Sequence, residues 1–591
     1  TVIRAAILIQ KWYRFTMARL EMRRRYSLSI FQSIEYADEQ DQLQLSNFFT
    51  FMLDHCTHPE AGNNKNKSNV EIVFEKLDKI AVPDSYYGPR LSFPLTVEDA
   101  NALLHAFRNE QLLHARYVLQ LLSETRRVLK EMPNITHLST SYSKEITVCG
   151  DLHGNLDDLL LIFYKNGLPS EQNPYVFNGD FVDRGKNSME ILIILFAFLL
   201  IYPNDLHLNR GNHEDYIMNL RYGFTKEVSK KYKDHWKQIL SLLRDVFSWL
   251  PLATIIDSKV LILHGGISDT TDLDFLNALE RNKVRDHIHV RVILFAFKNV
   301  ILDILWSDPR SQNGCTPNKC RGGGCYFGPD VTAKLFERYN LKMLIRSHEF
   351  KPEGYEISHD GKVITIFSAS NYYEEGSNRG AYIKLNPELT PRFVQYQVSK
   401  LTRRKNLRER VGTIESSALK SLREKIYAHR SELISAFAQY DVNGTGRISV
   451  NDWAAAMESV LQLELPWRML RSQLAQMNPD GEVDFMSCFY DLKMGQPIKE
   501  AQPALAETLC RYRKDLEIIF NIIDKDHSGL ISLEEFSQTW RLFTSHLGID
   551  IQDDSIDKLV LSIDYNKDGH IDFNEFLEAF HVVHRLEKKA T

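Results

Sequence analysis

Cysteine is scarce in this chain, which has seven cysteines among 591 residues. An odd number without regular spacing excludes a secreted, disulfide-stabilised scaffold and indicates a reducing compartment. Three of the seven, Cys315, Cys320 and Cys325, lie close together in a glycine-rich stretch. They lack the CxxC pairs typical of structural zinc, so a zinc site there is the weaker interpretation.

Long apolar runs are missing too. The longest, residues 191–201, is far short of the ~20 residues that a membrane-spanning helix needs, and it predicts a core helix instead. The formal net charge of −5 is too small and of the wrong sign for a bulk nucleic-acid binder. The chain starts at Thr1 without methionine, so a preceding targeting or lipid signal stays open. We expect a cytoplasmic protein, with membrane association only through such a segment.

The chain is too long for one hydrophobic core, and its composition changes along its length. Five regions are predicted: a basic amphipathic helix over 1–30, a helical and linker region over 31–94, an α/β domain over 95–398, a charged connector over 399–425, and a helical part over 426–591.

Short β-rich runs alternate with helical patterns through the predicted α/β domain. They cover residues 145–149, 175–177, 206–208, 259–263, 342–345 and 363–367. Runs that are apolar at every position are typical of strands buried on both faces and covered by helices. The sequence therefore predicts a layered α/β domain.

Polar side chains follow five of these runs at the point where each ends. They are Asp151 and His153; Asp180, Asp183 and Arg184; Asn212, His213 and Glu214; His264; and His348. Because the carboxyl ends of strands in a layered sheet open onto one crevice, we expect these side chains to converge. One such pair alone would be a helix cap or the partner of a buried donor. Five together, without a thiolate, favour a dinuclear site for hard or borderline divalent ions.

The motifs GDLHG, GDFVDRG and GNHE resemble the metallophosphoesterase signature. The longer motifs LNRGNHE, WSDP (306–309), RGGGCYFG (321–328), IRSHE and SASNYYEEGSN (368–378) are similar to those of the serine/threonine phosphoprotein phosphatases. This resemblance covers roughly residues 95–398. It implies a layered β-sandwich flanked by helices, and a two-metal enzyme in which water attacks the phosphomonoester directly, without a phosphoenzyme.

The resemblance also implies roles for individual residues. One metal would be held by Asp151 and His153, the other by Asn212, His264 and His348, and Asp180 would bridge both. His213 with Asp183 would give a proton to the leaving group, Arg184 and Arg321 would hold the phosphate, and Tyr372 would line the site. The implied ions are manganese, with iron or zinc as alternatives. The stretch 284–309 departs from the family because it is more apolar than the helix expected before WSDP.

Two twelve-residue stretches near the C-terminal end have the pattern of EF-hand calcium loops. The expected ligands are Asp524, Asp526, Ser528, the Leu530 carbonyl, Ser532 and Glu535 in one loop, and Asp564, Asn566, Asp568, the His570 carbonyl, Asp572 and Glu575 in the other. Ile531 and Ile571 occupy the positions at which two EF-hand loops hydrogen-bond, so the loops are predicted to pair.

Two earlier stretches depart from this pattern. Residues 441–452 keep Asp441, Asn443 and Thr445, with the Arg447 carbonyl, but end in Asp452 where calcium needs a bidentate glutamate, so binding there is expected to be weak or absent. Residues 476–487 lack acidic residues at both ends and are predicted to be a structural partner loop.

The segment Ile9–Arg19, IQKWYRFTMAR, resembles an IQ motif, the helix that binds calmodulin, with Phe15 where glycine is usual. A basic amphipathic helix could equally lie on a membrane or pack against its own protein, and calmodulin is the favoured partner.

The order of these parts resembles the protein phosphatases with EF-hands, a family related to the retinal degeneration C protein, and the resemblance suggests sensory neurons. We predict a calcium-responsive protein serine/threonine phosphatase. One alternative is a metallophosphoesterase for nucleotides or other small molecules, which would share the metal ligands. Another is a calcium-signalling scaffold with an inactive phosphatase domain, but such a scaffold would have lost a ligand or an arginine, and all are present.

Overall fold

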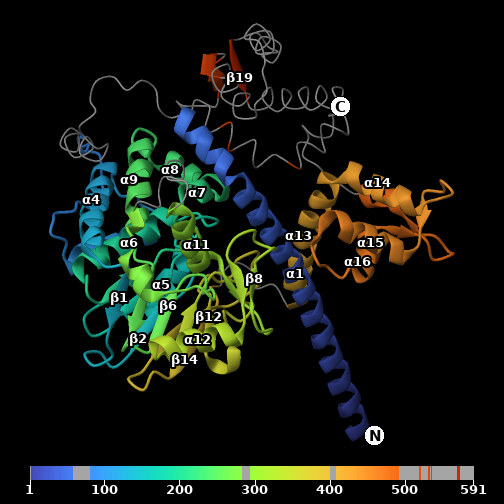
Figure 1. Cartoon of the computed structure of the whole chain (residues 1–591), viewed down its shortest axis with the longest axis horizontal. Coiled ribbons are helices and arrows are strands. Elements are labelled where there is room, and N and C mark those ends of the chain that lie inside the picture. Colours follow the sequence, from blue (N-terminus) through green and yellow to red (C-terminus); the bar gives the residue numbers. More distant parts are fainter. Residues whose placement is uncertain are drawn as a thin grey trace. The chain divides into compact units, whose positions relative to one another are not determined.

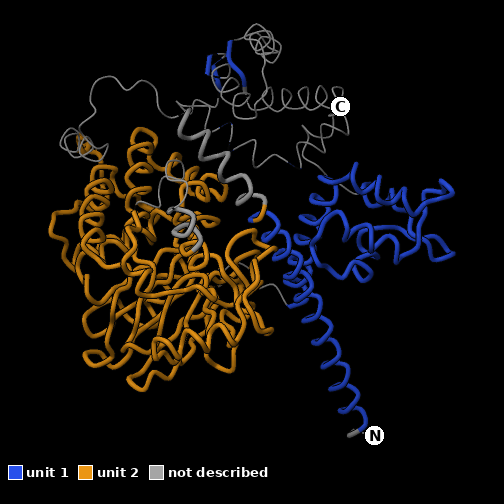
Figure 2. Tube along the Cα trace, in the orientation of Figure 1, with its two compact units in different colours: residues 1–39, 45–61, 405–591 blue, residues 40–44, 62–404 orange. Residues whose placement is uncertain are grey.

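The computed structural model in Figure 1 describes residues 2–56, 80–282, 293–398 and 407–490, with short pieces at 511, 518, 520, 530–532, 534–535 and 569–572. The chain divides into two compact units (Figure 2), which we describe separately. Unit 1 comprises residues 1–39, 45–61 and 405–591, and unit 2 comprises residues 40–44 and 62–404.

Unit 2 is built on two large sheets and one small one. The first sheet has the order β1 (Ile135–Leu138), β5 (Ala253–Ile256), β6 (Val260–Leu263), β10 (Met343–Arg346), β12 (Val363–Ile366) and β11 (Tyr355–Ser358). The second has the order β14 (Pro391–Tyr396), β13 (Gly380–Leu385), β2 (Ile146–Cys149), β3 (Tyr175–Phe177) and β4 (Leu206–Leu208). The small sheet has the order β7 (Asp308–Pro309), β9 (Cys325–Phe327) and β8 (Cys315–Pro317).

Branched aliphatic side chains fill the space between the two large sheets. Val148 and Val176 of the second sheet belong to one buried cluster with Ile262, Ile345 and Ile364 of the first, and each is at most 1% exposed. β-branched residues suit a pleated surface that is packed against another, so these strands form a sandwich. All six predicted strands are present, with ends that differ by no more than one residue.

Helices cover the outer faces of both sheets. The second sheet is covered by α3 (Val97–Arg108), α4 (Ala115–Glu131), α5 (Leu156–Asn166), α6 (Ser188–Ile201), α8 (Phe224–Lys231) and α9 (Trp236–Ser248). The first is covered by α10 (Leu273–Ala278), α11 (Ile293–Trp306) and α12 (Pro329–Tyr339). Two short helices, α7 (Tyr216–Tyr222) and η2 (His359–Gly361), complete the unit. The predicted layered α/β fold is therefore confirmed.

Helix α6 and the described end of α11 account for the unusually apolar stretches of the sequence. Helix α6 is buried at every position from Ser188 to Leu199, as the run 191–201 predicts. At the end of α11, Ile301, Ile304 and Trp306 are buried in the cluster beneath the first sheet, which accounts for the apolar end of 284–309. In the part of the chain that the structure describes, no helix is both long enough and apolar enough to span a bilayer.

Residues 80–94, expected to belong to a linker region, pack on the core of unit 2. Leu91 is buried among the helices of the second sheet, and Ile80 and Phe93 pack against the same cluster. The polar stretch at 58–70 lies outside the described residues.

Unit 1 contains helices and short paired strands. They are most of α1 (Val2–Cys56), then α13 (Leu407–Ala428), α14 (Arg430–Tyr440), α15 (Val450–Leu461), α16 (Trp467–Leu474) and η3 (Phe485–Phe489), with strands β15 (Arg447–Ile448), β16 (Gln476–Met477), β17 (Val483–Asp484), β18 (Leu530–Ser532) and β19 (His570–Asp572). Two expectations change here. The N-terminal helix extends well beyond residue 30, and the expected connector is a helix from Leu407 onward whose apolar side, including Leu422 and Ile426, lies in the core.

The EF-hand-like loops form two pairs. Ile448 of loop 441–452 pairs with Val483 of loop 476–487, in antiparallel register. Ile531 pairs with Ile571 in the same way, as the sequence predicts. Loop 476–487 is thus a structural partner of the loop before it.

Candidate dinuclear metal centre and catalytic site

The predicted ligands stand on tight turns directly after the strands of both sheets. Five site residues, His153, Asp180, Asp183, Arg184 and His348, have left-handed backbone, with φ between 44° and 71°. L-residues avoid this region, and such residues cluster at functional sites, where the surrounding structure holds them in place. Close packing is also required: a Cβ on Gly211 would lie 2.2 Å from Asp180 Oδ1, so only glycine fits before Asn212.

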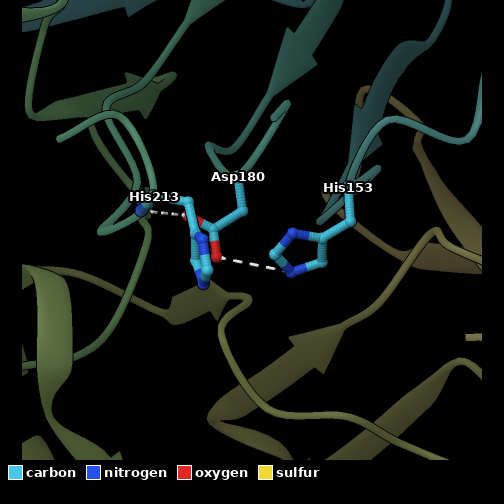
Figure 3. Close-up of side chains that lie close together, drawn as sticks. All are labelled: His153, Asp180 and His213. Carbon is cyan, nitrogen blue, oxygen red and sulfur yellow. Dashed lines mark hydrogen bonds and ion pairs between the residues drawn. The ribbon is translucent and has the colours of Figure 1, made fainter. Parts of the chain in front are cut away.

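Asp151, His153 and Asp180 form the first group of ligand atoms. His153 Nε2 lies 3.7 Å from an Asp151 carboxylate oxygen and 3.6 Å from Asp180 Oδ2. Figure 3 shows His153 and His213 on either side of the Asp180 carboxylate. Asp151, His153 and Asp180 are all buried. This spacing is that of atoms that share one cation rather than atoms bonded to each other.

The second group surrounds the same aspartate from the other side. The Asn212 side-chain oxygen lies 2.9 Å from His264 Nε2, 3.0 Å from His348 Nδ1 and 3.1 Å from Asp180 Oδ2. His264 Nε2 is itself 3.4 Å from Asp180 Oδ2. An amide oxygen that faces other electron-pair donors is unfavourable by itself, and it becomes favourable when a cation binds all of them.

Backbone carbonyl groups select which nitrogen of His153 and of His264 faces the centre. Nδ1 of His153 lies 3.0 Å from the Val182 carbonyl, and Nδ1 of His264 lies 2.8 Å from the Asn178 carbonyl. A carbonyl can only accept, so Nδ1 carries the hydrogen and Nε2 keeps its lone pair. This is the usual arrangement around histidines that bind metals.

The electrostatics of the centre favour divalent cations. Burial, reinforced by the charge of Asp180, raises the pKa of Asp151 to about 8. Burial also lowers the pKa of His153 and of His348 well below the ordinary value, so both imidazoles are neutral ligands. Crowded carboxylates with neutral imidazoles and no positive side chain among them fit a pair of divalent ions.

His213 and Asp183 form a hydrogen-bonded pair beside the first group. His213 Nδ1 lies 2.8 Å from Asp183 Oδ2, and both side chains are buried. Asn219 on α7, which the sequence did not single out, donates to Asp183 Oδ2 (2.9 Å) and to the His213 carbonyl (2.8 Å). The Phe224 amide donates to the other Asp183 oxygen. The imidazole is therefore fixed with Nε2 available for proton transfer.

Arg184 is held between aromatic rings. Its guanidinium carbon lies 4.7 Å from the centre of the Tyr222 ring and 5.3 Å from that of Tyr372. The Tyr372 ring in turn lies 5.3 Å from His153. Stacking orients the planar cation without using its hydrogen-bond donors.

Arg321 is held by an acidic partner from the motif WSDP. Its Nε donates to Asp308 Oδ2 (2.7 Å), and Nη2 donates to the His348 carbonyl (3.2 Å). Arg346 donates to the other oxygen of Asp308 (2.8 Å). Burial alone would raise the pKa of Asp308, but the charges of Arg321 and Arg346 outweigh it and keep that pKa below the ordinary value.

The structure thus brings all six predicted ligands and the five predicted catalytic residues into one site. Sequence reasoning missed three of the residues that hold them, Asn219, Asp308 and Arg346. Asp308 is quoted within WSDP and Arg346 within IRSHE, but neither is given a role, while Asn219 lies in no motif that marks it.

The predicted calcium ligands are described only in part. Ser532 and Glu535 lie together, with the serine hydroxyl donating to the carboxylate (2.9 Å), and Leu530, His570 and Asp572 lie in the paired strands. Asp524, Asp526, Ser528, Asp564, Asn566, Asp568 and Glu575 lie outside the described residues. In loop 441–452, Asp441 accepts from the amides of Thr445 and Gly446, and Asp452 accepts from the Ser449 hydroxyl.

Among the described residues, two groups of histidine and acidic side chains are close enough to hold a metal, and the cysteines at 315–325 form none; the groups are His153, Asp180 and His213, and Asp180, His264 and His348. We assign Asp151 rather than His213 to the first ion, because His213 is hydrogen-bonded to Asp183 and Asp151 lies 3.7 Å from His153 Nε2. A helix-covered double sheet with two ligand groups around a shared aspartate defines a metallophosphoesterase. The chain matches the family model described as Calcineurin-like phosphoesterase over residues 144–352. It also matches EF-hand domain pair over 430–538 and 513–581, and PPP5 TPR repeat region over 60–137.

Curated relatives define the family more narrowly. Human "Serine/threonine-protein phosphatase with EF-hands 1" is 57% identical, over 99% of this chain and 96% of its own length. Drosophila melanogaster "Serine/threonine-protein phosphatase rdgC" is 44% identical, over 99% of this chain and 91% of its own length. The chain belongs to the family of serine/threonine-protein phosphatases with EF-hands, and the predicted family and enzyme class are confirmed.

Proposed function

We propose that this protein removes phosphate from phosphoserine and phosphothreonine in proteins, and that calcium controls its rate. The observation that carries the proposal is the convergence of two buried ligand groups on Asp180, beside the His213–Asp183 pair and two oriented arginines. The phosphatase relatives and the EF-hand matches support both parts of it.

The site residues divide into two sets of ligands. Asp151, His153 and Asp180 would hold one ion, and Asp180, Asn212, His264 and His348 the other. When bound, the two ions supply a water that is hydroxide near neutral pH and positive charge beside the phosphoryl oxygens. The ligand set of carboxylate, imidazole and amide supports manganese, with iron or zinc as alternatives. Metal analysis of the purified chain, followed by activity after reconstitution with each ion, tests this assignment.

His213 has the properties of the proton donor. Burial, with the nearby His153 ring and the Arg184 charge, lowers the pKa of His213 well below the ordinary value. The imidazolium is therefore a strong acid but the minor form near neutral pH, so the assignment as proton donor to a departing serine or threonine alkoxide rests on the position of Nε2. Asp183 holds the ring by its Nδ1 hydrogen and so keeps Nε2 directed at the leaving group.

Arg184 and Arg321 bind the phosphoryl oxygens. Both guanidinium groups stay charged at any accessible pH and present forked donors that match an oxyanion. Arg184 is placed by aromatic stacking and Arg321 by Asp308, so neither has to be ordered when substrate binds.

A comparison of leaving groups tests the role of His213. His213→Gln should lower kcat for a phosphoserine peptide by ~10²- to 10⁴-fold, because the alkoxide cannot leave without a proton. The loss for p-nitrophenyl phosphate should be much smaller, since that phenolate leaves unprotonated. Equal losses on both substrates would contradict the assignment. His137→Gln, on β1 of the first sheet, is the matched control and should leave both rates unchanged.

The response to calcium is proposed from the EF-hand loops at 524–535 and 564–575. Their central residues Ile531 and Ile571 pair as in two-loop calcium domains. We expect phosphopeptide turnover in manganese to change between chelated and saturating calcium, and Glu535→Gln to reduce the change. Activity that does not depend on calcium would contradict this part of the proposal.

Calmodulin is the proposed partner of the first half of α1. Ile9, Trp12 and Phe15 are each about two-thirds exposed on that helix, and Arg14 and Arg19 are exposed beside them. Exposed apolar and basic side chains on one helix suit the groove of a calmodulin lobe. Binding of fluorescent calmodulin should be lost in Trp12→Glu and kept in Tyr87→Glu, which changes an even more exposed aromatic residue outside α1.

For location we propose the cytoplasm. Cys149, Cys315, Cys320, Cys325 and Cys488 are free thiols, which supports a reducing compartment. Fractionation of cells that express the natural full-length protein tests this.

A further inference from the structure

Tyr372 lies on a loop that is anchored at an unusually polar and fully buried point. Ser370, two residues earlier, is completely buried, and so is Asp158 on α5, five residues beyond the ligand His153. The Ser370 amide donates to one Asp158 oxygen and the Ser370 hydroxyl to the other, both at 2.7 Å. The Asn155 side chain donates to the Ser370 carbonyl (3.1 Å). Every polar group of Ser370 is therefore bonded.

The same point holds the end of the phosphatase domain. The Val398 amide donates to the Ser370 hydroxyl (3.2 Å), and the Asn371 side chain donates to the Val398 carbonyl (2.8 Å). The Gln397 side chain donates to Asn371 Oδ1 (3.1 Å) and to the Asn378 carbonyl (2.8 Å). Residues 397–398 are thus bonded to both ends of the Tyr372 loop.

These contacts have a direct path to the catalytic residues. Asn378, which accepts from the Tyr372 amide through its side chain (2.8 Å), is one of the residues that Gln397 contacts. The Tyr372 ring lies 5.3 Å from both the His153 ring and the Arg184 guanidinium. A shift of the loop would therefore move a wall of the site and one support of the arginine.

Gln397 and Val398 lie at the point where the chain leaves the phosphatase domain toward the EF-hand loops. Val398 is the last residue before the segment 399–406, which leads to α13 and the calcium-binding loops. A displacement that passes along the chain from α13 and the EF-hand loops, on the C-terminal side, arrives first at Gln397 and Val398. Of the described residues, these are followed by no further strand or helix of unit 2 that could absorb a displacement.

We propose that Asp158, Ser370, Asn371, Gln397 and Val398, together called the Ser370 cluster, position Tyr372 and couple its loop to the segment that carries the calcium signal. Asp158 and Ser370 are positioning residues for the reaction. Gln397 is the coupling residue, because it bonds the loop without being part of it. The coupling rests on the proposed calcium control, whereas the positioning does not.

Two neighbouring glutamines give a matched test of coupling. Gln397→Ala removes both bonds to the loop, whereas Gln395→Ala, two residues earlier and within β14, removes bonds to Glu353 only. We measure kcat for a phosphoserine peptide in manganese, in chelated and in saturating calcium, on the full chain. Gln397→Ala should lose at least half of the calcium response and Gln395→Ala should keep it. If both variants respond like the wild type, the coupling is wrong.

Two neighbouring aspartates test positioning in the same way. Asp158→Asn leaves one of the two Ser370 donors without its acceptor, and we expect kcat/KM to fall about tenfold. Asp157→Asn, at the adjacent exposed position, should have no effect. If Asp158 acts through Tyr372, its effect should largely disappear in a Tyr372→Ala background, whereas a merely structural loss would add. Additive losses would overturn the proposal.

If Asp158→Asn does not fold, the same double-mutant cycle with Tyr372→Ala can be measured with Ser370→Ala, which is a smaller change. The two proposals also fail separately. A wild-type chain that ignores calcium overturns calcium control and the coupling with it, while the double-mutant cycle in constant calcium still decides whether Tyr372 is positioned by Asp158.

Discussion

The buried metal centre and the exposed loop at 441–452 shift the pKa values of their carboxyl groups in opposite directions. Asp441 accepts hydrogen bonds from the Thr445 and Gly446 amides, and these bonds lower its pKa below the ordinary value. Asp151 faces Asp180 in a buried site, and its pKa is raised to about 8. The loop is electrostatically satisfied by its own backbone, whereas the buried centre is satisfied only by cations.

This difference in pKa shifts separates a loop that needs no ion from a centre that is built to bind ions. A self-satisfied loop can fold without an ion, and it contributes pairing and packing through Ile448 and the helices beside it. A centre that needs ions has its donors held apart by the fold at a distance that suits one cation in each group. The following predictions test this contrast, from the largest expected effect to the smallest.

The shared aspartate should matter most. Asp180→Asn weakens both ligand groups at once, so we expect kcat/KM on a phosphopeptide to fall ~10³-fold or more, equivalent to about 4 kcal/mol. Metal analysis should show fewer than two ions bound per chain. Asp157→Asn is the control and should retain metal and rate. A variant with normal metal content and normal rate would mean that Asp180 does not bridge.

Calcium binding should separate the loops at 441–452 and 524–535. Glu535→Gln removes the bidentate ligand, and we expect calcium affinity at that loop to fall ~10²-fold or more. Asp452→Asn should change nothing, because the loop is already closed by its own hydrogen bonds. Isothermal titration of both variants checks this. A loss of one bound calcium in Asp452→Asn would show that loop 441–452 is a working site.

Removal of the active-site ions should make stability depend on pH. Because the folded pKa of Asp151 is raised, the folded state holds its proton more tightly than the unfolded chain, so stability in chelator should fall as pH rises from about 4 to about 8. Asp151 contributes at most about 1.4 kcal/mol per pH unit to the slope, and Asp158 and Glu214, whose pKa values burial raises to about 7, add to it. Thermal unfolding in chelator should show the slope, and Asp151→Asn should reduce it. A wild-type curve that is equally steep in saturating manganese would contradict this explanation.

Much of the site could be predicted because strand ends and motifs coincide. The runs before Asp151, Asp180 and Asn212 are mostly apolar and are buried at every position, so their boundaries are sharp. The sequence pattern could not show that the ligands come from two sheets, since His264 and His348 follow strands of the first sheet and the others follow strands of the second. Strand pairing depends on contacts between residues far apart in the chain, which local periodicity does not record.

The supporting residues were the hardest to predict. Asp158 and Ser370 are separated by 212 residues and each fits an ordinary local role, on a helix and in a loop. The amphipathic helix at the start of the chain shows the same limit. Ile30 of α1 lies in the core of unit 1 with Leu422 and Phe437, although periodicity alone cannot tell a helix that packs on its own protein from one that binds a partner.

The left-handed backbone at His153 and His348 favours glycine as a replacement at these two positions. Replacement by glycine removes a side chain but also relieves a conformation that costs an L-residue roughly 1 kcal/mol or more. Glycine at either position leaves an imidazole-sized hole in an otherwise intact centre. Imidazole added to the buffer can then occupy this hole and serve as a metal ligand. The inactive glycine variant should therefore regain phosphatase activity when imidazole is added, which is chemical complementation.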